Sequence, residues 1–389
     1  MSTTVRSLTD VVVDIVDNRG RTCPTAQQGF PLIATNCIKP SSRYPTFENV
    51  RFVDEGTYRD WFRGHPVPGD IIFVCKGAPG RVAMTPDPVS FCIAQDMVAL
   101  RPNPAYVDPE YLYYRLLAPD VQKAIENMHV GTLIPHFKKG DFPGLRFSVH
   151  DSRTEQRRIA RALGALDDLI ENNEQAIHIQ RQLAVTLFAR ACQDERAGAV
   201  PFGNVAELVR DTVRPTALDP DLPYVGLEHF AEEGAGLREV GRAGDTESTK
   251  NRFHAGDVLY GKLRPYFRKV DRPDFEGVCS TEVWVMRPRG WATSAYLHYL
   301  AQDRAFTEWA MRGSGGTRMP RANWDHVCSM LVAVPDQEQL TELDAVAESL
   351  WQMTCSLRQE NETLRNTRDE LLPLLMSGRI APGEVELSA

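Results

Sequence analysis

The stretch PGDIIFVCK occupies residues 68–76, and AGDVLYGK occupies residues 255–262. In both, a Gly-Asp pair that favours a tight turn is followed by a short apolar run that favours a β-strand. Gly69 and Gly256 lie 187 positions apart (256 − 69). A match this short is a weak signal alone, so its weight depends on whether the flanking sequence repeats with it.

The flanking sequence does repeat, because five more pairs of blocks recur in the same order. They are VVDIVDN (12–18) with VAELVRD (205–211), FPLIATNCI (30–38) with LPYVGLEHF (222–230), CIAQDMVALRP (92–102) with CSTEVWVMRP (279–288), YLYY (111–114) with YLHY (296–299), and GTLIP (131–135) with GTRMP (316–320). The offsets run from 185 (316 − 131) to 193 (205 − 12). This shared order indicates a tandem duplication, so we predict two copies of one unit.

Each copy combines strand and helix patterns. MVALRP (97–102) and VWVMRP (283–288) predict strands that end at a proline. Residues 109–128 and 292–311 have apolar side chains at helical spacing. GTLIP and GTRMP would form the loop after that helix, since glycine permits positive φ and proline resists helix continuation. The predicted fold class of each unit is therefore α+β.

A long helix is predicted after each unit. Ser152 and Glu155 form a capping box at the start of the first helix, and Asp336 with Gln339 offers a similar cap for the second. Apolar residues then recur at steps of three and four, which is typical of a coiled-coil seam. The seam residues are Ile159, Leu163, Leu166, Ile170, Ile177, Ala184 and Leu187 in the first helix, and Leu343, Val346, Leu350, Met353, Leu357, Leu364 and Leu371 in the second.

Polar residues interrupt both seams. They are Asn173 and Gln180 in the first helix, and Glu360 and Thr367 in the second. Such residues select the register of a specific partner helix, so we expect the two long helices to pair with each other as a coiled coil. We favour antiparallel pairing because a duplicated unit closes naturally about an approximate twofold axis. The second helix is expected to break or kink at Pro373 and to end near Gly378.

The chain of 389 residues is long enough for two domains. The predicted division is a first domain over 1–150, a helix over 151–195, a second domain over 196–335, a helix over 336–378 and a tail over 379–389. No stretch approaches the ~18 apolar residues of a membrane span, and the N-terminus lacks a signal-peptide pattern. We expect a cytoplasmic protein. Its eight cysteines are widely spaced without a C-x-x-C pair, which predicts reduced, mostly buried thiols.

This arrangement resembles the specificity subunit of type I restriction–modification systems. The resemblance covers essentially the whole chain and rests on the order of its parts. The segments that carry it are DSRTEQRRIA (151–160) with its weaker counterpart DQEQLTEL (336–343), GKLRPYFRKV (261–270) and ELLPLLMSGRI (370–380). It implies two target recognition domains, each of which reads one half of a split double-stranded DNA sequence. The helices would fix the separation of the half-sites and dock two methyltransferase subunits.

The resemblance also implies that adenine methylation, ATP-driven translocation and cleavage belong to partner subunits, the latter two to restriction or motor subunits. The chain itself would then carry no catalytic residue, cofactor or metal. Arg157, Arg158 and Arg161 near the start of the first helix are the expected partner-binding residues. Leu340 and Thr341 replace the Arg157-Arg158 pair in the second helix. Docking contacts of this kind are therefore expected on one side only.

Basic residues gather near the repeated blocks although the net charge is −8. Residues 242–269 carry seven basic and three acidic residues (7 − 3 = +4), and residues 138–161 give the same balance. Arginine and lysine neutralise phosphates, and arginine also reads guanine. The candidate DNA-binding residues are Lys76, Arg81, Lys138, Lys139, Lys262, Arg264, Arg268, Lys269, Arg318 and Arg321. The alternative for each residue is ordinary solvated surface.

Motifs of a stand-alone enzyme are weak. NPAY (103–106) is only a partial match to the loop of amino-methyltransferases and predicts a turn. Cys92 and Cys279 occupy matching strand positions but no histidine recurs with both, so we interpret them as small core residues. We therefore predict a DNA-recognition and assembly subunit without catalytic activity. The competing hypotheses are a coiled-coil scaffold that joins two protein-binding domains, and a stand-alone nuclease or methyltransferase.

Overall fold

The computed structural model describes residues 2–47, 49–128, 135–192, 198–214, 217–231, 233–316 and 318–384. The chain divides into two compact units, which we call unit 1 and unit 2. Unit 1 contains Met1–Glu171 and Asn361–Ala389, and unit 2 contains Asn172–Glu360. Unit 1 is thus completed by the C-terminal part of the chain.

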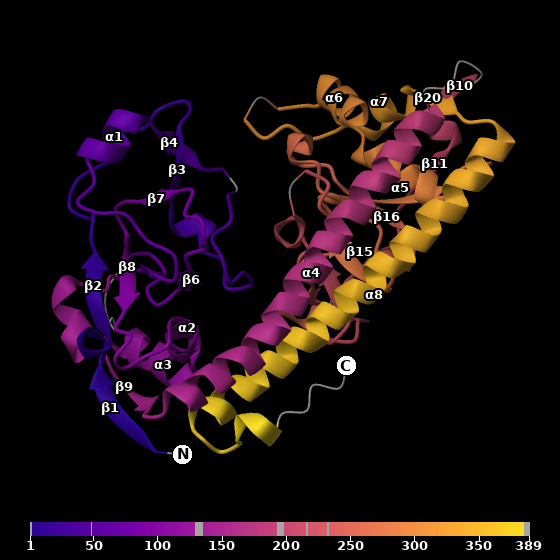
Figure 1. Ribbon diagram of the computed structural model, residues 1–389. Helices are drawn as coiled ribbons and strands as arrows, with labels where there is room; N and C mark the ends of the chain where they lie inside the picture. Colours follow the sequence, from indigo (N-terminus) through magenta and orange to yellow (C-terminus); the bar gives the residue numbers. More distant parts are fainter. Residues whose placement is uncertain are drawn as a thin grey trace. The chain divides into compact units, whose positions relative to one another are not determined.

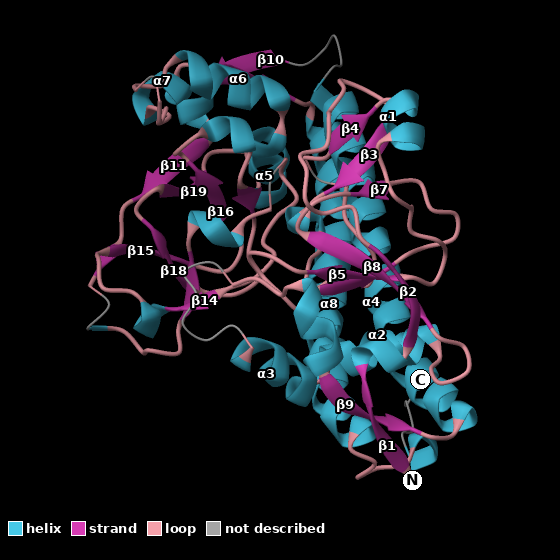
Figure 2. Cartoon of the chain, turned by 90° about the vertical axis from the view of Figure 1, so that its left-hand side faces the viewer, coloured by secondary structure: helices cyan, strands magenta, loops and turns pink. Residues whose placement is uncertain are grey.

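Unit 1 is built on a four-stranded antiparallel sheet in the order β2-β8-β5-β6. Figure 2 shows β2, β8 and β5 next to one another. A three-stranded sheet β4-β3-β7 and a pair β1-β9 complete its strands. The bounds are β1 Thr3–Ser7, β2 Val12–Val16, β3 Phe30–Ile33, β4 Arg51–Val53, β5 Ile71–Val74, β6 Val82–Met84, β7 Cys92–Ile93, β8 Met97–Pro102 and β9 Arg146–His150, with helices α1 Glu55–Asp60, α2 Pro109–Leu117 and α3 Pro119–Asn127.

Unit 2 repeats this plan. Its four-stranded sheet has the order β11-β19-β16-β17, a second sheet has the order β12-β15-β18-β13-β14, and β10 pairs with β20. The bounds are β10 Gly198–Pro201, β11 Ala206–Val209, β12 Thr212–Val213, β13 Pro223–Val225, β14 Gly241–Arg242, β15 Lys250–Phe253, β16 Val258–Gly261, β17 Val270–Asp271, β18 Gly277–Ser280, β19 Val283–Pro288 and β20 Leu331–Val334, with helices α5 Ser294–Gln302, α6 Arg304–Arg312 and α7 Trp324–Cys328.

The two units also agree in strand register. β3 runs parallel to β7 with Leu32 opposite Cys92 and Ile33 opposite Ile93, and β13 runs parallel to β18 with Tyr224 opposite Val278 and Val225 opposite Cys279. Parallel neighbours are the exception in these sheets, so their recurrence at matching residues is specific. The predicted duplication is therefore present in the topology as well as in the sequence. Unit 2 differs by the additional strands β12 and β15 at one end of its second sheet.

The repeated Gly-Asp pair builds the same turn twice. Gly69 and Gly256 have φ angles of 82° and 85°, a region that favours glycine, just before β5 and β16. Asp70 and Asp257 then accept a backbone N–H bond at 2.9 Å from three residues upstream. Each carboxylate also pairs with the arginine of the RP dipeptide in the neighbouring strand.

These carboxylate–arginine contacts are close in both units. Arg101 reaches Asp70 at 3.0 Å, and Arg287 reaches Asp257 at 2.8 Å. Both aspartates are buried, with 1% and 4% of their surface exposed. A buried carboxylate needs such partners, because its desolvation is otherwise costly. The recurrence of Gly-Asp and Arg-Pro in both units thus reflects one ion pair that locks a turn to the neighbouring strand of each sheet.

The prediction of one helix over 109–128 and one over 292–311 is wrong, since each stretch forms two short helices. In unit 1, Pro119 begins α3 and holds Ala118 in an extended conformation (ψ 140°). In unit 2 no proline is present, and Asp303 instead takes the same conformation and caps α6 through the backbone N–H of Ala305 at 2.8 Å. Pro119 in unit 1 and Asp303 in unit 2 therefore produce the same break between two helices.

The long helices are α4, Arg153–Cys192, and α8, Gln337–Met376. At about 1.5 Å per residue, the 40 residues of each span roughly 60 Å. Both begin at the predicted caps. The N–H of Glu155 donates to Ser152 Oγ at 3.4 Å, whereas Asp336 and Gln339 cap each other reciprocally at 2.8 and 3.3 Å.

The two helices pair antiparallel, as Figure 1 lets the reader follow along α4 and α8. Within unit 1, Asn361 Nδ2 donates to the carbonyl of Ile170 at 3.4 Å, and Arg368 Nη1 contacts Asp167 Oδ1 at 2.7 Å. Within unit 2, Thr354 Oγ1 donates to Gln180 Oε1 at 2.9 Å. Residue numbers rise on one helix as they fall on the other. The predicted α+β fold with an antiparallel helix pair is confirmed.

The predicted seam of the second helix needs correction. Val346 and Met353 are exposed, at 42% and 50%, although the apolar ladder included them. The buried positions are Leu343, which the ladder included, and Ala347, which it did not, followed by the polar residues Thr354 and Asn361. The seam polar residue is thus Asn361 rather than the exposed Glu360. Spacing alone could not choose between these two stripes, because both repeat every seven residues.

The C-terminal end of α8 differs from the prediction at Pro373. The helix is not broken there, since it continues to Met376 and the N–H of Ser377 donates to the Pro373 carbonyl at 3.0 Å. It ends as predicted near Gly378, whose φ is 70°. Leu372, Leu375 and Met376 enter the core of unit 1. Within the described residues, no helix is long and apolar enough to cross a membrane.

Candidate nucleic-acid interface and partner-docking surface

Pro135 and Pro320, the last residues of GTLIP and GTRMP, bond to the loop that follows the Gly-Asp strand. In unit 1, the carbonyl of Pro135 accepts a bond from the N–H of Gly77 at 3.0 Å. In unit 2, the carbonyl of Pro320 accepts the equivalent bond from the N–H of Arg264 at 2.7 Å. The first four residues of GTLIP and Thr317 of GTRMP lie outside the described residues. The signature therefore joins two loops into one platform in each unit.

A second backbone bond beside the first repeats this arrangement. The N–H of Phe137 donates to the Cys75 carbonyl at 2.6 Å, and the N–H of Ala322 donates to the Lys262 carbonyl at 2.9 Å. We call these two loop pairs the signature platforms: residues 75–77 with 135–138 in unit 1, and 262–264 with 320–322 in unit 2. They bring Lys76 near Lys138, and Lys262 near Arg264 and Arg321.

The loop over 262–269 contains two residues in a strained conformation. Arg264 and Arg268 have φ angles of 53° and 47° on either side of a 3₁₀ turn, Pro265–Phe267. Left-handed backbone costs a residue with a Cβ about 1 kcal/mol or more, and such strain concentrates at functional sites. The turn therefore has one arginine at each end.

Several candidate residues already have partners. Arg321 Nε contacts Glu282 Oε2 at 3.0 Å, and Arg268 Nη2 lies 3.8 Å from Glu233 Oε2. Lys269 Nζ donates to the Leu227 carbonyl at 2.7 Å. Lys262 is partly exposed at the platform, and Arg318 is exposed outside it. The clustering of Lys262 with Arg321 is thus a property of the loop pair.

In unit 1 the candidates are more scattered. The side chain of Lys76 is 48% exposed and its Nζ lies 4.0 Å from Asp96 Oδ1. Arg81 and Lys138 are exposed, while the side chain of Lys139 lies outside the described residues. Arg210, Thr212, Asn251 and Asn323 were not selected from the sequence, yet they line an open hollow with Lys262 and Arg321. Arg210 could have been selected from the sequence, because it belongs to the repeated block VAELVRD, which ends beside the platform.

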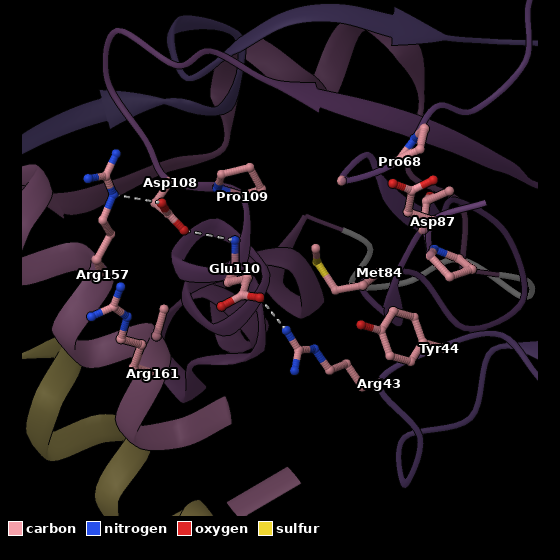
Figure 3. A pocket seen from close by; sticks show the side chains of 14 residues that line it. Arg43, Tyr44, Pro68, Met84, Asp87, Asp108, Pro109, Glu110, Arg157 and Arg161 are labelled. Carbon is pink, nitrogen blue, oxygen red and sulfur yellow. Dashed lines mark hydrogen bonds and ion pairs between the residues drawn. The ribbon is translucent and has the colours of Figure 1, made fainter. Parts of the chain in front are cut away.

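The predicted partner-binding residues border a pocket of about 480 Å³ in unit 1. Figure 3 shows Arg157 and Arg161 on α4 at one side and Arg43 with Tyr44 at the other. Asp108 and Glu110 from the start of α2 lie between them. Arg158 is exposed on α4 but does not line the pocket.

The charges of this pocket are partly paired. Arg157 Nε lies 3.5 Å from Asp108 Oδ2, and Arg43 contacts Glu110 at 2.7 Å and Asp168 at 3.1 Å. The Arg43 side chain is only 9% exposed. Arg161 is exposed beside these pairs. A surface of this kind suits a protein partner that brings carboxylates to Arg157 and Arg161. In unit 2, Leu340 stands in the core and offers no such charge.

A buried charge network ties α8 to unit 2. Asp271 Oδ2 accepts from Arg358 Nη1 at 3.0 Å and from the N–H of Leu237 at 2.6 Å. Burial favours a higher pKa for Asp271, but Arg358 and the backbone N–H groups of Leu237 and Arg272 outweigh it and lower that pKa. His298 lies in the same network, and burial together with Arg272, Arg181 and Arg358 lowers its pKa to about 3. In unit 1, Asp167 takes the corresponding role with Arg368 and Tyr114.

The cysteines have the environment of core residues. Burial raises the pKa of the Cys92 and Cys279 thiols to about 12. A thiol with such a pKa holds its proton at neutral pH and is a poor nucleophile. Among the described residues, no group of three or more His, Cys, Asp or Glu side chains could hold a metal ion.

Residues 6–180 match the family described as the type I restriction modification DNA specificity domain. The match includes the platform of unit 1 and the first part of α4. Residues 6–180 of the chain therefore form a type I restriction–modification DNA specificity domain.

Relatives named in this family cover much of the chain. It is 24% identical over 292 residues to the type I restriction enzyme EcoDI specificity subunit of Escherichia coli, a match that spans 64% of each protein. It is 19% identical over 351 residues to the MjaIX specificity subunit of Methanocaldococcus jannaschii, covering 82% of this chain and 79% of that one. The chain thus spans just under two thirds of the length of the E. coli relative.

A solved specificity subunit has the same fold. The crystal structure of a type I restriction–modification S subunit from M. genitalium aligns over 96% of both chains with a TM-score of 0.56 and 16% sequence identity. At this identity the similarity concerns the fold alone. The aligned part of this chain includes both units and both long helices.

Proposed function

We propose that this chain is the DNA sequence-recognition subunit of a type I restriction–modification complex. In this role, the domains over 1–150 and 196–335 act as target recognition domains, and each reads one half of a bipartite double-stranded DNA site. The observation that carries the proposal is the signature platform, which is built twice from equivalent backbone bonds and presents basic side chains each time. Basic side chains position a protein on phosphates, and a few of them at base edges supply specificity.

We further infer that the helix pair docks two methyltransferase subunits, with restriction or motor subunits completing the complex. Support comes from exposed apolar side chains on both long helices. Ile179 is 63% exposed and Leu183 46% on α4, while Val346 and Met353 are 42% and 50% exposed on α8. Apolar side chains gathered on a helix surface are typical of a partner interface. Arg157, Arg158 and Arg161 would add a basic contact at the start of α4.

In this proposal the chain has no catalytic role, and methyl transfer and cleavage belong to its partners. The protonated state of the buried thiols agrees with that division, because it removes the most reactive side chains of the repeated blocks from chemistry. The residues of the platforms then act by binding and positioning DNA.

The test uses the full chain assembled with its methyltransferase subunits. Binding to a duplex library with randomised sequence should select a site with two specified halves. Lys262→Glu with Arg264→Glu should weaken selection at one half-site, because both side chains belong to the unit 2 platform. Arg304→Ala, which removes a side chain 86% exposed on α6, is the matched control and should leave both halves intact.

Salt dependence separates this function from a protein-only scaffold. For DNA binding, log K should fall with log salt by about 0.9 per phosphate neutralised. A scaffold that joins two protein-binding domains should show little affinity for any duplex. Equal loss at both half-sites in the Lys262→Glu, Arg264→Glu variant would contradict the assignment of one reader to each unit.

A further inference from the structure

An open hollow of about 490 Å³ lies beside the signature platform of unit 2. Its wall contains Lys262 and Arg321 from the platform, Arg210 and Thr212 from the segment after β11, and Asn251 from β15. Trp284 and Trp324 also line it, with ring centroids 5.2 Å apart. The hollow therefore combines donor side chains with aromatic surface.

Unit 1 fills the corresponding place with its own side chains. Alignment of VVDIVDN with VAELVRD sets Asp17 against Arg210 and Arg19 against Thr212. Arg19 donates to both carboxylate oxygens of Asp17 at 2.9 Å and to the carbonyl of Phe137 at 3.2 Å. Its side chain is only 13% exposed. The guanidinium of unit 1 is thus turned inward against the platform.

Two smaller residues open this space in unit 2. Thr212 stands where unit 1 has Arg19, and Ala322 stands where unit 1 has Phe137, as the equivalent platform bonds of Phe137 and Ala322 indicate. Phe137 is fully buried. Both replacements remove a large side chain from one place, and Thr212 and Ala322 line the hollow that results. The hollow is therefore a specific difference between two copies of the same architecture.

The chemistry of the wall selects for acceptors. Arg210, Lys262 and Arg321 contribute three cations, against Asp325 as the acidic residue of the lining. Arg210 is exposed, and Arg321 keeps more than half of its side chain exposed despite its pair with Glu282. Guanine presents two acceptors, N7 and O6, in the major groove, and arginine or lysine binds both. Adenine presents one acceptor, N7, beside its N6 donor, and cytosine presents a donor, so three cations in the wall favour guanine over both.

We propose that the hollow of unit 2 is a base-reading site for the acceptor edge of guanine, with Arg210 as the principal reader. The inference rests on the DNA-recognition function proposed above and deepens it. Unit 1 withdraws the equivalent guanidinium into its pair with Asp17, so the two units read their half-sites with different surfaces.

The test uses the complex of the full chain with its methyltransferase subunits and a duplex library randomised across both half-sites. The wild-type complex should require guanine at one position of the half-site that depends on Lys262 and Arg264. In Arg210→Ala, preference for guanine at that position should fall about 5- to 150-fold, the range expected for one lost base contact. The other half-site should be unchanged.

A second variant refills the hollow as in unit 1. Thr212→Arg, combined with Arg210→Asp, should abolish the same base preference while thermal unfolding stays within a few degrees of wild type. Because Arg210 is exposed, Arg210→Ala keeps the fold intact and decides the question even if the double variant is unstable. Arg304→Ala on α6 is again the matched control.

The possible outcomes test the proposed function and the base-reading site separately. If the wild-type complex selects no bipartite site, the proposed function itself fails. If it does, and Arg210→Ala retains the full sequence preference, the base-reading site is refuted while the function stands. A uniform loss of affinity across all sequences would identify a phosphate contact and refute it as well. Weaker binding of the methyltransferase subunits with unchanged base preference would also refute the base-reading site, because a protein would then cover the hollow.

Discussion

His298 shows how one residue of a repeated block gains a new role in its own unit. YLHY places His298 where YLYY has Tyr113, and both side chains are buried. His298 Nε2 lies 2.8 Å from Gln302 Nε2, and the charged groups that face it are Asp271, Arg272, Arg181 and Arg358. Burial and three arginines keep the ring neutral, so its pKa is about 3.

This pKa predicts acid sensitivity of unit 2. The unfolded chain binds a proton at His298 below about pH 6.5, whereas the native state does not until about pH 3. The stabilisation is therefore complete above pH 6.5 and is lost as the pH falls toward 3, with a limiting slope of about 1.4 kcal/mol per pH unit. In His298→Gln this part of the slope should disappear. Urea unfolding at pH 7.5 and pH 5.5 measures it, and equal slopes for both proteins would refute the prediction.

At the scale of elements, the first helix and the second helix share a plan but differ in surface charge. Both begin at a capped turn, and both place a polar residue in the seam. Only α4 carries the cluster of Arg157, Arg158 and Arg161, because the positions at the same distance from the cap of α8 hold Thr341, Glu342 and Ala345. A duplicated element has thus kept its packing face while its outer face diverged.

Under the proposed function, this difference predicts unequal docking of the two methyltransferase subunits. Arg157→Glu with Arg161→Glu should weaken the first site about 10-fold or more, since reversal of two charges opposes carboxylates of a partner. The complex should then contain one tightly bound methyltransferase rather than two, as measured by native mass spectrometry or light scattering. Glu342→Arg with Ala345→Arg at the start of α8 is the matched change and should leave the stoichiometry at two. Loss of both subunits in the α4 variant would show that the cluster is not specific to one site.

At the scale of the whole molecule, each compact unit is composed of segments that are distant in sequence. Unit 1 takes its last part from Asn361–Ala389, and Leu375 is fully buried among its residues. Arg368 of the same helix contacts Asp167 within this unit. The N-terminal domain is therefore completed only when the end of the chain has been added, which couples the two ends in folding.

The coupling predicts a remote effect of a C-terminal substitution. Leu375→Ala should destabilise unit 1 by about 2–5 kcal/mol, the range for a buried leucine. Hydrogen exchange should then become faster in β2, β8 and α2, while β16 and α5 in unit 2 keep their protection. Met353→Ala, on the same helix but at a side chain 50% exposed, is the control and should change neither unit. Equal loss of protection in both units would contradict the division of α8 between them.

Local patterns in the sequence were sufficient for the duplication, the strands and the helix caps. These features depend on neighbours a few residues away, as in the Gly-Asp turn before β5 and β16 or the cap of Asp336 and Gln339. The helix break at Asp303 was missed because an aspartate can cap a helix or lie within one, and only the extended backbone there distinguishes the two.

For the candidate site, too, the sequence predicted some features and missed others. Basic residues near the repeated blocks could be identified from charge spacing, and Lys262, Arg264 and Arg321 do lie at one platform. The contacts of the basic residues could not be predicted, because Lys269 donates to a carbonyl of a distant loop and Arg268 lies beside Glu233. The hollow also could not be predicted from the sequence, because residues from β11, β15 and the platform meet there only after folding.

The sequence by itself determined that this protein is two copies of an α+β unit, each followed by a capped helix with an apolar seam. Tertiary structure alone decided which helix stripe is buried, how α8 is shared between the units, and where Thr212 and Ala322 leave space that Arg19 and Phe137 fill in the other copy. The physical reason is the range of the interactions. Turns, caps and periodicity act within a few residues, whereas burial and cavity shape depend on side chains that are hundreds of positions apart.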